Sequence, residues 1–183
     1  VGENVRNIHV GDRVTSETTY ETCGSCHYCH TGDLNLCGAR RGVGTNVNGS
    51  MAEYVVNHEA RIHVLPENVN LLAAALTEPL ACGVHAVIER GHVHKGDIVC
   101  VFGAGAIGQM VAQVAHACGA TVIMAGLSSD VERLQIATQC GIQRTVDQQA
   151  EELSGVISEM TNGLGVDLAF ECSGAVPAAN KAL

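Results

Sequence analysis

Residues 23–37, with the sequence CGSCHYCHTGDLNLC, gather four thiols and two imidazoles into one short segment, here called the cysteine loop. Two chemistries fit this composition. The pattern Cys-x-x-Cys-His, which can attach a c-type haem, occurs twice in overlapping frames that share Cys26. The four thiols, spaced C-x2-C-x2-C-x7-C, also fit a closed tetrahedral zinc site made of Cys23, Cys26, Cys29 and Cys37.

The zinc interpretation uses every cysteine of the loop. Because the two haem frames share one cysteine, at most one haem could attach, and two thiols would have no role. Four thiolates leave no coordination position open for a substrate, so the predicted zinc site is structural. His27 and His30 could in principle each replace a cysteine, but exposed loop histidines are the simpler interpretation.

A second chemically capable segment is the glycine turn, residues 103–108, with the sequence GAGAIG. Gly103, Gly105 and Gly108 follow a continuous apolar run and open a segment with helical periodicity, as the dinucleotide-binding fingerprint requires. The glycines allow a tight turn, close approach of the pyrophosphate and close helix packing, and the phosphates then lie at the helix N-terminus. Ile107, inside the motif, is included among the cofactor-binding residues.

The second strand of such a fold usually ends in a carboxylate that binds the ribose hydroxyls of NAD. Here that position is Gly126. A glycine removes the repulsion that a 2'-phosphate would meet, and Ser128, Ser129 and Arg133 could hydrogen-bond this phosphate, which slightly favours NADP over NAD. Alternatively, Asp130 reaches back to the ribose, or NAD binds without this contact.

The remaining sequence predicts the elements that position these groups. Residues 9–17 and 49–66 alternate apolar and polar positions, which predicts short strands in a mainly β half. Residues 71–91 favour helix, broken by Pro79, which either ends one helix or starts the next. From residue 97 onward, apolar strands alternate with helices, which predicts a parallel, doubly wound sheet and an α/β fold.

Composition excludes several function classes. A formal charge of −9 and the lack of any basic run argue against nucleic acid as a partner, and no apolar run is long enough to predict a membrane span. The five cysteines outside the cysteine loop are scattered singly in apolar segments, which predicts reduced core residues and a cytoplasmic protein. These five are Cys82, Cys100, Cys118, Cys140 and Cys172.

Seven segments in this order resemble one family, the zinc-dependent medium-chain alcohol dehydrogenases, in particular its sorbitol (polyol) and threonine dehydrogenase branch. The resemblance implies a partial GroES-like β domain over residues 1–77 and a partial Rossmann domain that binds NAD or NADP over residues 78–183. The segments are GDRV (11–14), the cysteine loop, GSMAEYVV (49–56), LPENV (65–69), TEPLACGVHAV (77–87), GAGAIG (103–108) and ECSGA (171–175).

The resemblance also implies the activity. The expected reaction is hydride transfer between a secondary alcohol, a polyol or similar small hydroxyl compound, and NAD(P), by an enzyme that is a homo-oligomer at full length. Of the family's catalytic residues this chain contains Glu78, in TEPL. A purely structural alternative for Glu78 is a carboxylate that stabilises a helix N-terminus.

Family members bind a second, catalytic zinc through a Cys and the His of a Gly-His-Glu motif, both upstream of GDRV. Neither residue precedes Gly11 here, so we expect the chain to be an internal fragment of the enzyme. The alternative is a non-catalytic, zinc-stabilised module that binds a nucleotide.

Overall fold

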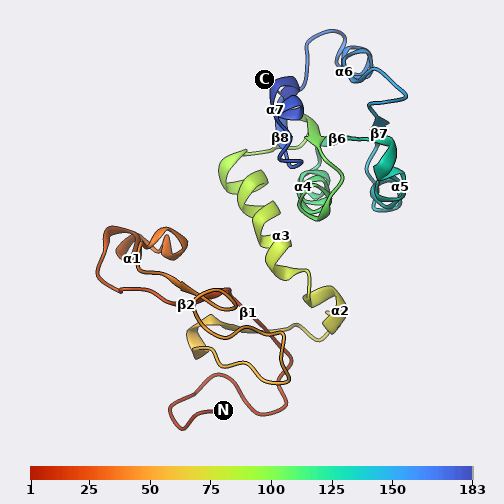
Figure 1. Ribbon diagram of the computed structural model, residues 1–183. Helices are drawn as coiled ribbons and strands as arrows, with labels where there is room; N and C mark the ends of the chain where they lie inside the picture. The colour runs from red at the N-terminus through yellow and green to blue at the C-terminus, as the bar shows by residue number, and fades with distance from the viewer. Residues whose placement is uncertain (183) are drawn as a thin grey trace. The chain divides into compact units, whose positions relative to one another are not determined.

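The computed structural model describes residues 1–182. The chain divides into two compact units, which we call unit 1, residues 1–78, and unit 2, from Pro79 onward. Figure 1 labels those of their helices and strands for which there is room.

Unit 1 contains two small antiparallel sheets and several short helices. One sheet pairs β1 with β4, so that Val14 lies opposite Val64, and the other pairs β2 with β3. The elements are β1 (Val14–Ser16), β2 (Thr19–Glu21), α1 (His27–Thr31), η1 (Leu34–Leu36), β3 (Arg41–Gly42), η2 (Glu59–Arg61), β4 (Ile62–Val64) and α2 (Leu71–Ala74).

The predicted strand content of unit 1 is partly wrong. β1 and β4 lie in the two segments expected to form strands, but residues 51–56 form no strand. Met51, Tyr54 and Val56 project from this segment and are strongly exposed. Alternation alone predicted a strand there, but within residues 1–182 the segment has no neighbouring strand with which to pair.

Unit 1 buries little apolar surface. Of the buried apolar side chains in residues 1–182, only Cys37, Leu65 and Ala74 belong to it. Polar contacts hold the loop between β4 and α2 instead. The Arg13 guanidinium donates to the backbone oxygens of Val69 and Pro66 in this loop at 2.7 and 3.0 Å. A unit with so small a core needs an additional source of stability, such as a metal.

Residues 71–91 form two α-helices and a π-helical turn. After α2, α3 runs over Thr77–Val84 and continues into the π-helix η3, His85–Arg90. Pro79 lies in the first turn of α3, where backbone N–H groups have no helical acceptor, so of the two predicted alternatives it starts a helix rather than ending one.

Unit 2 is built on a parallel sheet with the strand order β7-β6-β5-β8. β5 pairs with β6, the next strand in the chain, on one side and with β8, the last strand described, on the other. The strand order therefore reverses between β5 and β8. This arrangement confirms the predicted doubly wound fold. The strands are β5 (Ile98–Phe102), β6 (Thr121–Gly126), β7 (Arg144–Asp147) and β8 (Leu168–Glu171).

Helices cover both faces of this sheet (Figure 1). On one face Val99, Val101, Val122 and Met124 pack against α4, α5 and η3. On the other face the alternate strand residues, including Cys100 and Phe102, pack against α6 and α7. The helices are α4 (Ala106–Ala117), α5 (Val131–Gln139), α6 (Leu153–Thr161) and α7 (Val176–Ala182), with the 3-10 turn η4 (Ser128–Asp130) before α5.

The two central strands, β5 and β6, are therefore buried on both sides, which explains their continuous apolar sequences. The carboxyl ends of the strands all meet at one edge of the sheet, and the glycine turn follows β5 at this edge. None of the helices described within residues 1–182 combines the length and apolarity needed to cross a bilayer.

Candidate metal centre and nucleotide site

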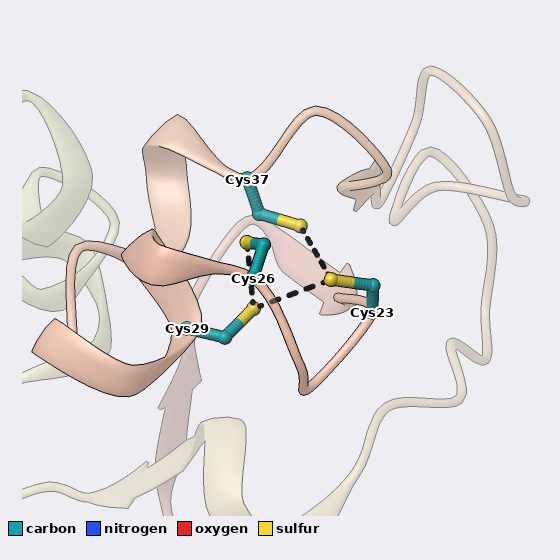
Figure 2. Close-up of side chains that lie close together, drawn as sticks. All are labelled: Cys23, Cys26, Cys29 and Cys37. Atoms are coloured by element: carbon teal, nitrogen blue, oxygen red, sulfur yellow. Dashed lines mark hydrogen bonds between the residues drawn. The ribbon is translucent and has the colours of Figure 1, made fainter.

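The cysteine loop brings its four thiols to one point. Cys26 is the N-cap of α1 and Cys29 lies one turn later on the same side, while Cys37 caps the end of η1. Cys23 approaches from the segment after β2, and Figure 2 shows the four sulfurs directed toward one another. Cys37 is buried and Cys23 is exposed, so the cluster lies at the surface with one side covered.

The distances between the sulfurs fit a tetrahedral metal site. Cys23 Sγ lies 3.8 Å from Cys29 Sγ and 3.7 Å from Cys37 Sγ, and Cys26 Sγ lies 3.6 Å from Cys29 Sγ. All four sulfurs lie within 4.8 Å of one another. Zinc–sulfur bonds of about 2.3 Å place tetrahedral sulfurs about 3.8 Å apart, whereas a disulfide requires about 2.05 Å. The chain's own residues therefore fit zinc.

The two loop histidines do not join this cluster. The metal-binding group found within residues 1–182 contains the four cysteines alone. The His27 ring packs edge-on against Tyr28, and His30 is exposed in the last turn of α1. A four-sulfur cluster leaves no thiol over for haem attachment, so the geometry favours zinc over haem.

Backbone groups prepare one thiol for ionisation. Hydrogen bonds from the backbone N–H groups of Ser25 and Cys26 lower the pKa of Cys23 to about 6. The pKa of Cys26 is raised to about 11, because burial and its neighbouring sulfurs outweigh a hydrogen bond from the Cys29 backbone. Zinc binds thiolates, so this site gains metal with release of protons.

The five cysteines outside the cysteine loop lie in different environments. Cys100 is buried and Cys118 and Cys172 are partly buried, but Cys82 and Cys140 are exposed, so the expectation of a core position is wrong for these two. Cys82 lies on the outer face of α3, and Cys140 caps the end of α5. Burial raises the pKa of Cys100 to about 12, so this thiol stays protonated and unreactive.

The glycine turn joins β5 to α4. Gly103 has φ +99°, a left-handed conformation that a side chain disfavours, and a Cβ there would lie 2.9 Å from Ser173 N. Gly105 is the N-cap of α4 and faces open space, so a phosphate can approach its backbone. A Cβ on Gly108 would lie 1.9 Å from Gly103 O, so the helix packs directly on the turn. Ile107 is 41% exposed in the first turn of α4.

A pocket of about 350 Å³ opens beside this turn in unit 2. Gly103, Gly126 and Ser173 place it at the carboxyl ends of β5, β6 and β8, where the strand order reverses. Ligands of open α/β sheets bind at this position. Its further lining residues are Ala125, Leu127, Asp130, Gln148, Ala175, Pro177, Ala178 and Lys181.

Among the other sequence-predicted residues of unit 2, Ser128 and Arg133 make contacts outside the pocket. Gly126 lines it, whereas Ser128 and Arg133 are not among its lining residues. The Ser128 hydroxyl donates to Asp147 at 2.6 Å, and the Arg133 guanidinium donates to Asp130 at 2.8 Å. Glu78 is the second residue of α3 and is exposed.

Family models recognise both halves of this chain. Residues 1–67 match the alcohol dehydrogenase GroES-like domain, and residues 106–183 match the zinc-binding dehydrogenase domain. The chain belongs to the zinc-dependent medium-chain alcohol dehydrogenase family. The family, and with it the GroES-like and Rossmann architecture, is thus confirmed as predicted.

The relatives of this medium-chain dehydrogenase chain include polyol dehydrogenases. It is 49% identical to a sorbitol dehydrogenase of Halalkalibacterium halodurans, over 100% of the chain and 53% of the relative. It is 47% identical to a D-arabitol-phosphate dehydrogenase of Enterococcus avium, over 100% of the chain and 52% of the relative. The chain spans about half the length of these curated relatives.

A solved structure agrees with this assignment. The crystal structure of a zinc-binding dehydrogenase from Sinorhizobium meliloti, bound to NADP, superposes with a TM-score of 0.88 at 32% identity. The match covers 99% of this chain and 53% of the other.

In this dehydrogenase chain, the residues after β8 form one wall of the pocket, and the sequence did not predict most of them. Ser173 and Lys181 line the pocket, yet only the segment ECSGA, noted for its family resemblance, pointed to this region. Within it Glu171 holds the turn: its carboxylate accepts from the Ser173 hydroxyl at 2.5 Å, the Ser173 N–H at 2.7 Å and the Gly174 N–H at 3.1 Å. These hydrogen bonds lower the pKa of Glu171, and the bond from the Ser173 hydroxyl has the largest effect.

We expect Glu171→Gln to loosen this turn, lower stability and weaken nucleotide binding a few-fold. The stabilisation by the carboxylate is complete above its ordinary pKa of 4.5 and is lost as the pH falls through the lower pKa of the folded protein, because over this range the unfolded chain takes up the proton before the folded protein does. Urea unfolding at a series of pH values measures this. Glu159→Gln, an exposed carboxylate on α6, is the control, and a pH-independent difference would contradict the expectation.

Proposed function

We propose that the protein carrying this chain is a zinc-dependent oxidoreductase that transfers hydride between a secondary alcohol, a polyol or similar small hydroxyl compound, and NAD(P). The observation that carries this proposal is the pocket beside the glycine turn, at the point where the strand order of the sheet reverses. The polyol class is supported by the similarity to the sorbitol and arabitol-phosphate dehydrogenases.

Residues of unit 2 bind and orient the nucleotide in this proposal. Gly103, Gly105 and Gly108 let the pyrophosphate reach the N-terminus of α4, where free backbone N–H groups and the helix dipole stabilise negative charge. Ile107 covers the nucleotide from the first turn of α4, and Gly126 lies toward its ribose. Ser128 and Arg133 are the nearby groups able to meet a 2'-phosphate, once released from Asp147 and Asp130.

Two metal ions take part, and this chain supplies the ligands of one. Cys23, Cys26, Cys29 and Cys37 would hold a structural zinc that stabilises unit 1. When bound, a catalytic zinc supplies Lewis acidity toward the alcohol oxygen, and the nicotinamide supplies the hydride acceptor. Glu78 contributes a carboxylate to the surroundings of the reacting alcohol, and its exposed position at the start of α3 leaves it available.

The proposal extends to the state of the full-length enzyme. We place it in the cytoplasm, supported by nine cysteines without a disulfide, as a reducing compartment maintains them. The small core of unit 1 supports a homo-oligomer, in which a second copy covers apolar side chains such as Tyr54 and Val56. We also propose that the domain boundary lies between residues 77 and 78, which the division of the structure into compact units supports.

A substrate screen of the full-length protein tests the proposed function. Purified protein is given a panel of polyols and secondary alcohols with NAD+ or NADP+, and formation of the reduced nucleotide is followed by its ultraviolet absorbance. We expect turnover with at least one polyol. Binding of a nucleotide without turnover of any alcohol would instead favour the non-catalytic module.

A further inference from the structure

The end of β6 lacks the carboxylate that usually binds the nucleotide ribose, but the structure supplies one from elsewhere. A Cβ built on Gly126 would lie 3.3 Å from the Cβ of Asp130. The side chain of Asp130 thus fills the space that a side chain at position 126 would use. Asp130 comes four residues after Gly126, and the turn η4 folds the chain back so that this side chain lies at the end of β6.

Asp130 is held in place at the pocket. Its Oδ2 accepts from the Leu127 N–H at 3.1 Å, its Oδ1 accepts from Arg133 at 2.8 Å, and its side chain is 17% exposed. It lines the pocket together with Gly103 and Gly126. Each carboxylate oxygen has two acceptor positions, so each can still accept a hydroxyl.

A buried contact fixes this group relative to the glycine turn. Gln109, on α4, is 8% exposed and donates through Nε2 to the Arg133 backbone oxygen at 2.7 Å. The first turn of α5 is thereby tied to the helix that follows the glycine turn, and Asp130 immediately precedes α5. The carboxylate and the phosphate-binding backbone are therefore positioned by one rigid connection.

We propose that Asp130 accepts hydrogen bonds from the adenosine ribose hydroxyls and selects NAD over NADP. This inference rests on the proposed function, in which the pocket takes a pyridine dinucleotide. The 2'- and 3'-hydroxyls of NAD donate to a carboxylate, whereas the 2'-phosphate of NADP carries a like charge and is repelled. Arg133, which could otherwise attract this phosphate, is already neutralised by its ion pair with Asp130.

This assignment reverses the slight preference for NADP drawn from the absence of a side chain at Gly126. The pocket has one other charged lining residue, Lys181, whose Nζ donates to Gln148 at 3.2 Å. Leu127 and Arg133 each donate to one carboxylate oxygen of Asp130. These bonds hold the negative charge at the strand end, which favours NAD over NADP.

Isothermal titration of the full-length protein with NAD+ and with NADP+ tests the inference. We expect the wild type to bind NAD+ at least about ten-fold more tightly than NADP+. In Asp130→Asn, which keeps the shape and an acceptor for the Leu127 N–H, we expect NAD+ to bind about ten-fold more weakly and NADP+ more tightly, so that the preference disappears or reverses. Adding Arg133→Gln to this variant should remove the gain for NADP+.

Glu132→Gln is the matched control, since it removes an exposed carboxylate in the first turn of α5, two residues after Asp130, that does not line the pocket. We expect its ratio of NAD+ to NADP+ affinity to equal that of the wild type. An unchanged ratio in Asp130→Asn, or an equal change in Glu132→Gln, overturns the role of Asp130. Failure of the wild type to bind either nucleotide would instead refute the proposed function.

Discussion

Replacing Cys37 by Ser is expected to destabilise unit 1 by more than about 4 kcal/mol and to lower its melting temperature sharply. Cys37 is the most buried of the four clustered thiols, at 5% exposure. A structural zinc contributes on the order of 10 kcal/mol to folding in small domains, and removal of one ligand forfeits much of this. Unit 1 has only two small sheets and few buried apolar side chains with which to compensate.

Thermal unfolding of wild type and variant, each with and without a strong chelator, measures this effect. Cys140→Ser is the matched control, because Cys140 is an exposed thiol outside the cysteine loop. The chelator should lower the melting temperature of the wild type and of Cys140→Ser, but change that of Cys37→Ser little. Equal melting of the two variants would count against a stabilising metal in the loop.

Replacing Gly108 by Ala is expected to abolish most nucleotide binding, reducing affinity more than about ten-fold, and to destabilise unit 2 by about 3 kcal/mol. The new Cβ would lie 1.9 Å from the Gly103 backbone oxygen, far inside contact distance. Neither atom is at the end of a flexible side chain, so α4 must move away from the glycine turn. The backbone N–H groups that receive the pyrophosphate move with it.

Gly155→Ala provides the control for this substitution. Gly155 also lies in a helix, α6, but a Cβ there would meet nothing within 4 Å. Alanine favours a helix by up to about 1 kcal/mol over glycine, so this variant should be slightly more stable and bind the nucleotide normally. Urea unfolding and nucleotide titration distinguish the two variants, and normal binding by Gly108→Ala would refute the tight helix–turn contact.

The features that sequence predicted well are those encoded by short spacing. Cys23 to Cys37 fall within one loop, and Gly103 to Gly108 within one turn, so local geometry alone constrains each group. The central strands β5 and β6 were predictable because burial on both faces leaves a continuous apolar run.

The features that sequence missed depend on tertiary context. Residues 51–56 alternate like a strand, but a strand also needs a partner along its edge. Ser173 joins Gly103 only because β8 pairs with β5, which no local pattern reveals. The sequence alone leaves Asp130 as one of the alternatives, because its return to the end of β6 depends on the backbone path of the turn η4.

Native mass spectrometry of the full-length protein, with and without added NAD+, tests most directly the claim that a four-thiolate zinc site and a dinucleotide pocket occur in this chain. The wild type should carry one more zinc ion per chain than Cys37→Ser and should gain the mass of one dinucleotide per chain when NAD+ is added. Equal zinc content in the two proteins, an adduct of haem mass, or no dinucleotide adduct would contradict this claim.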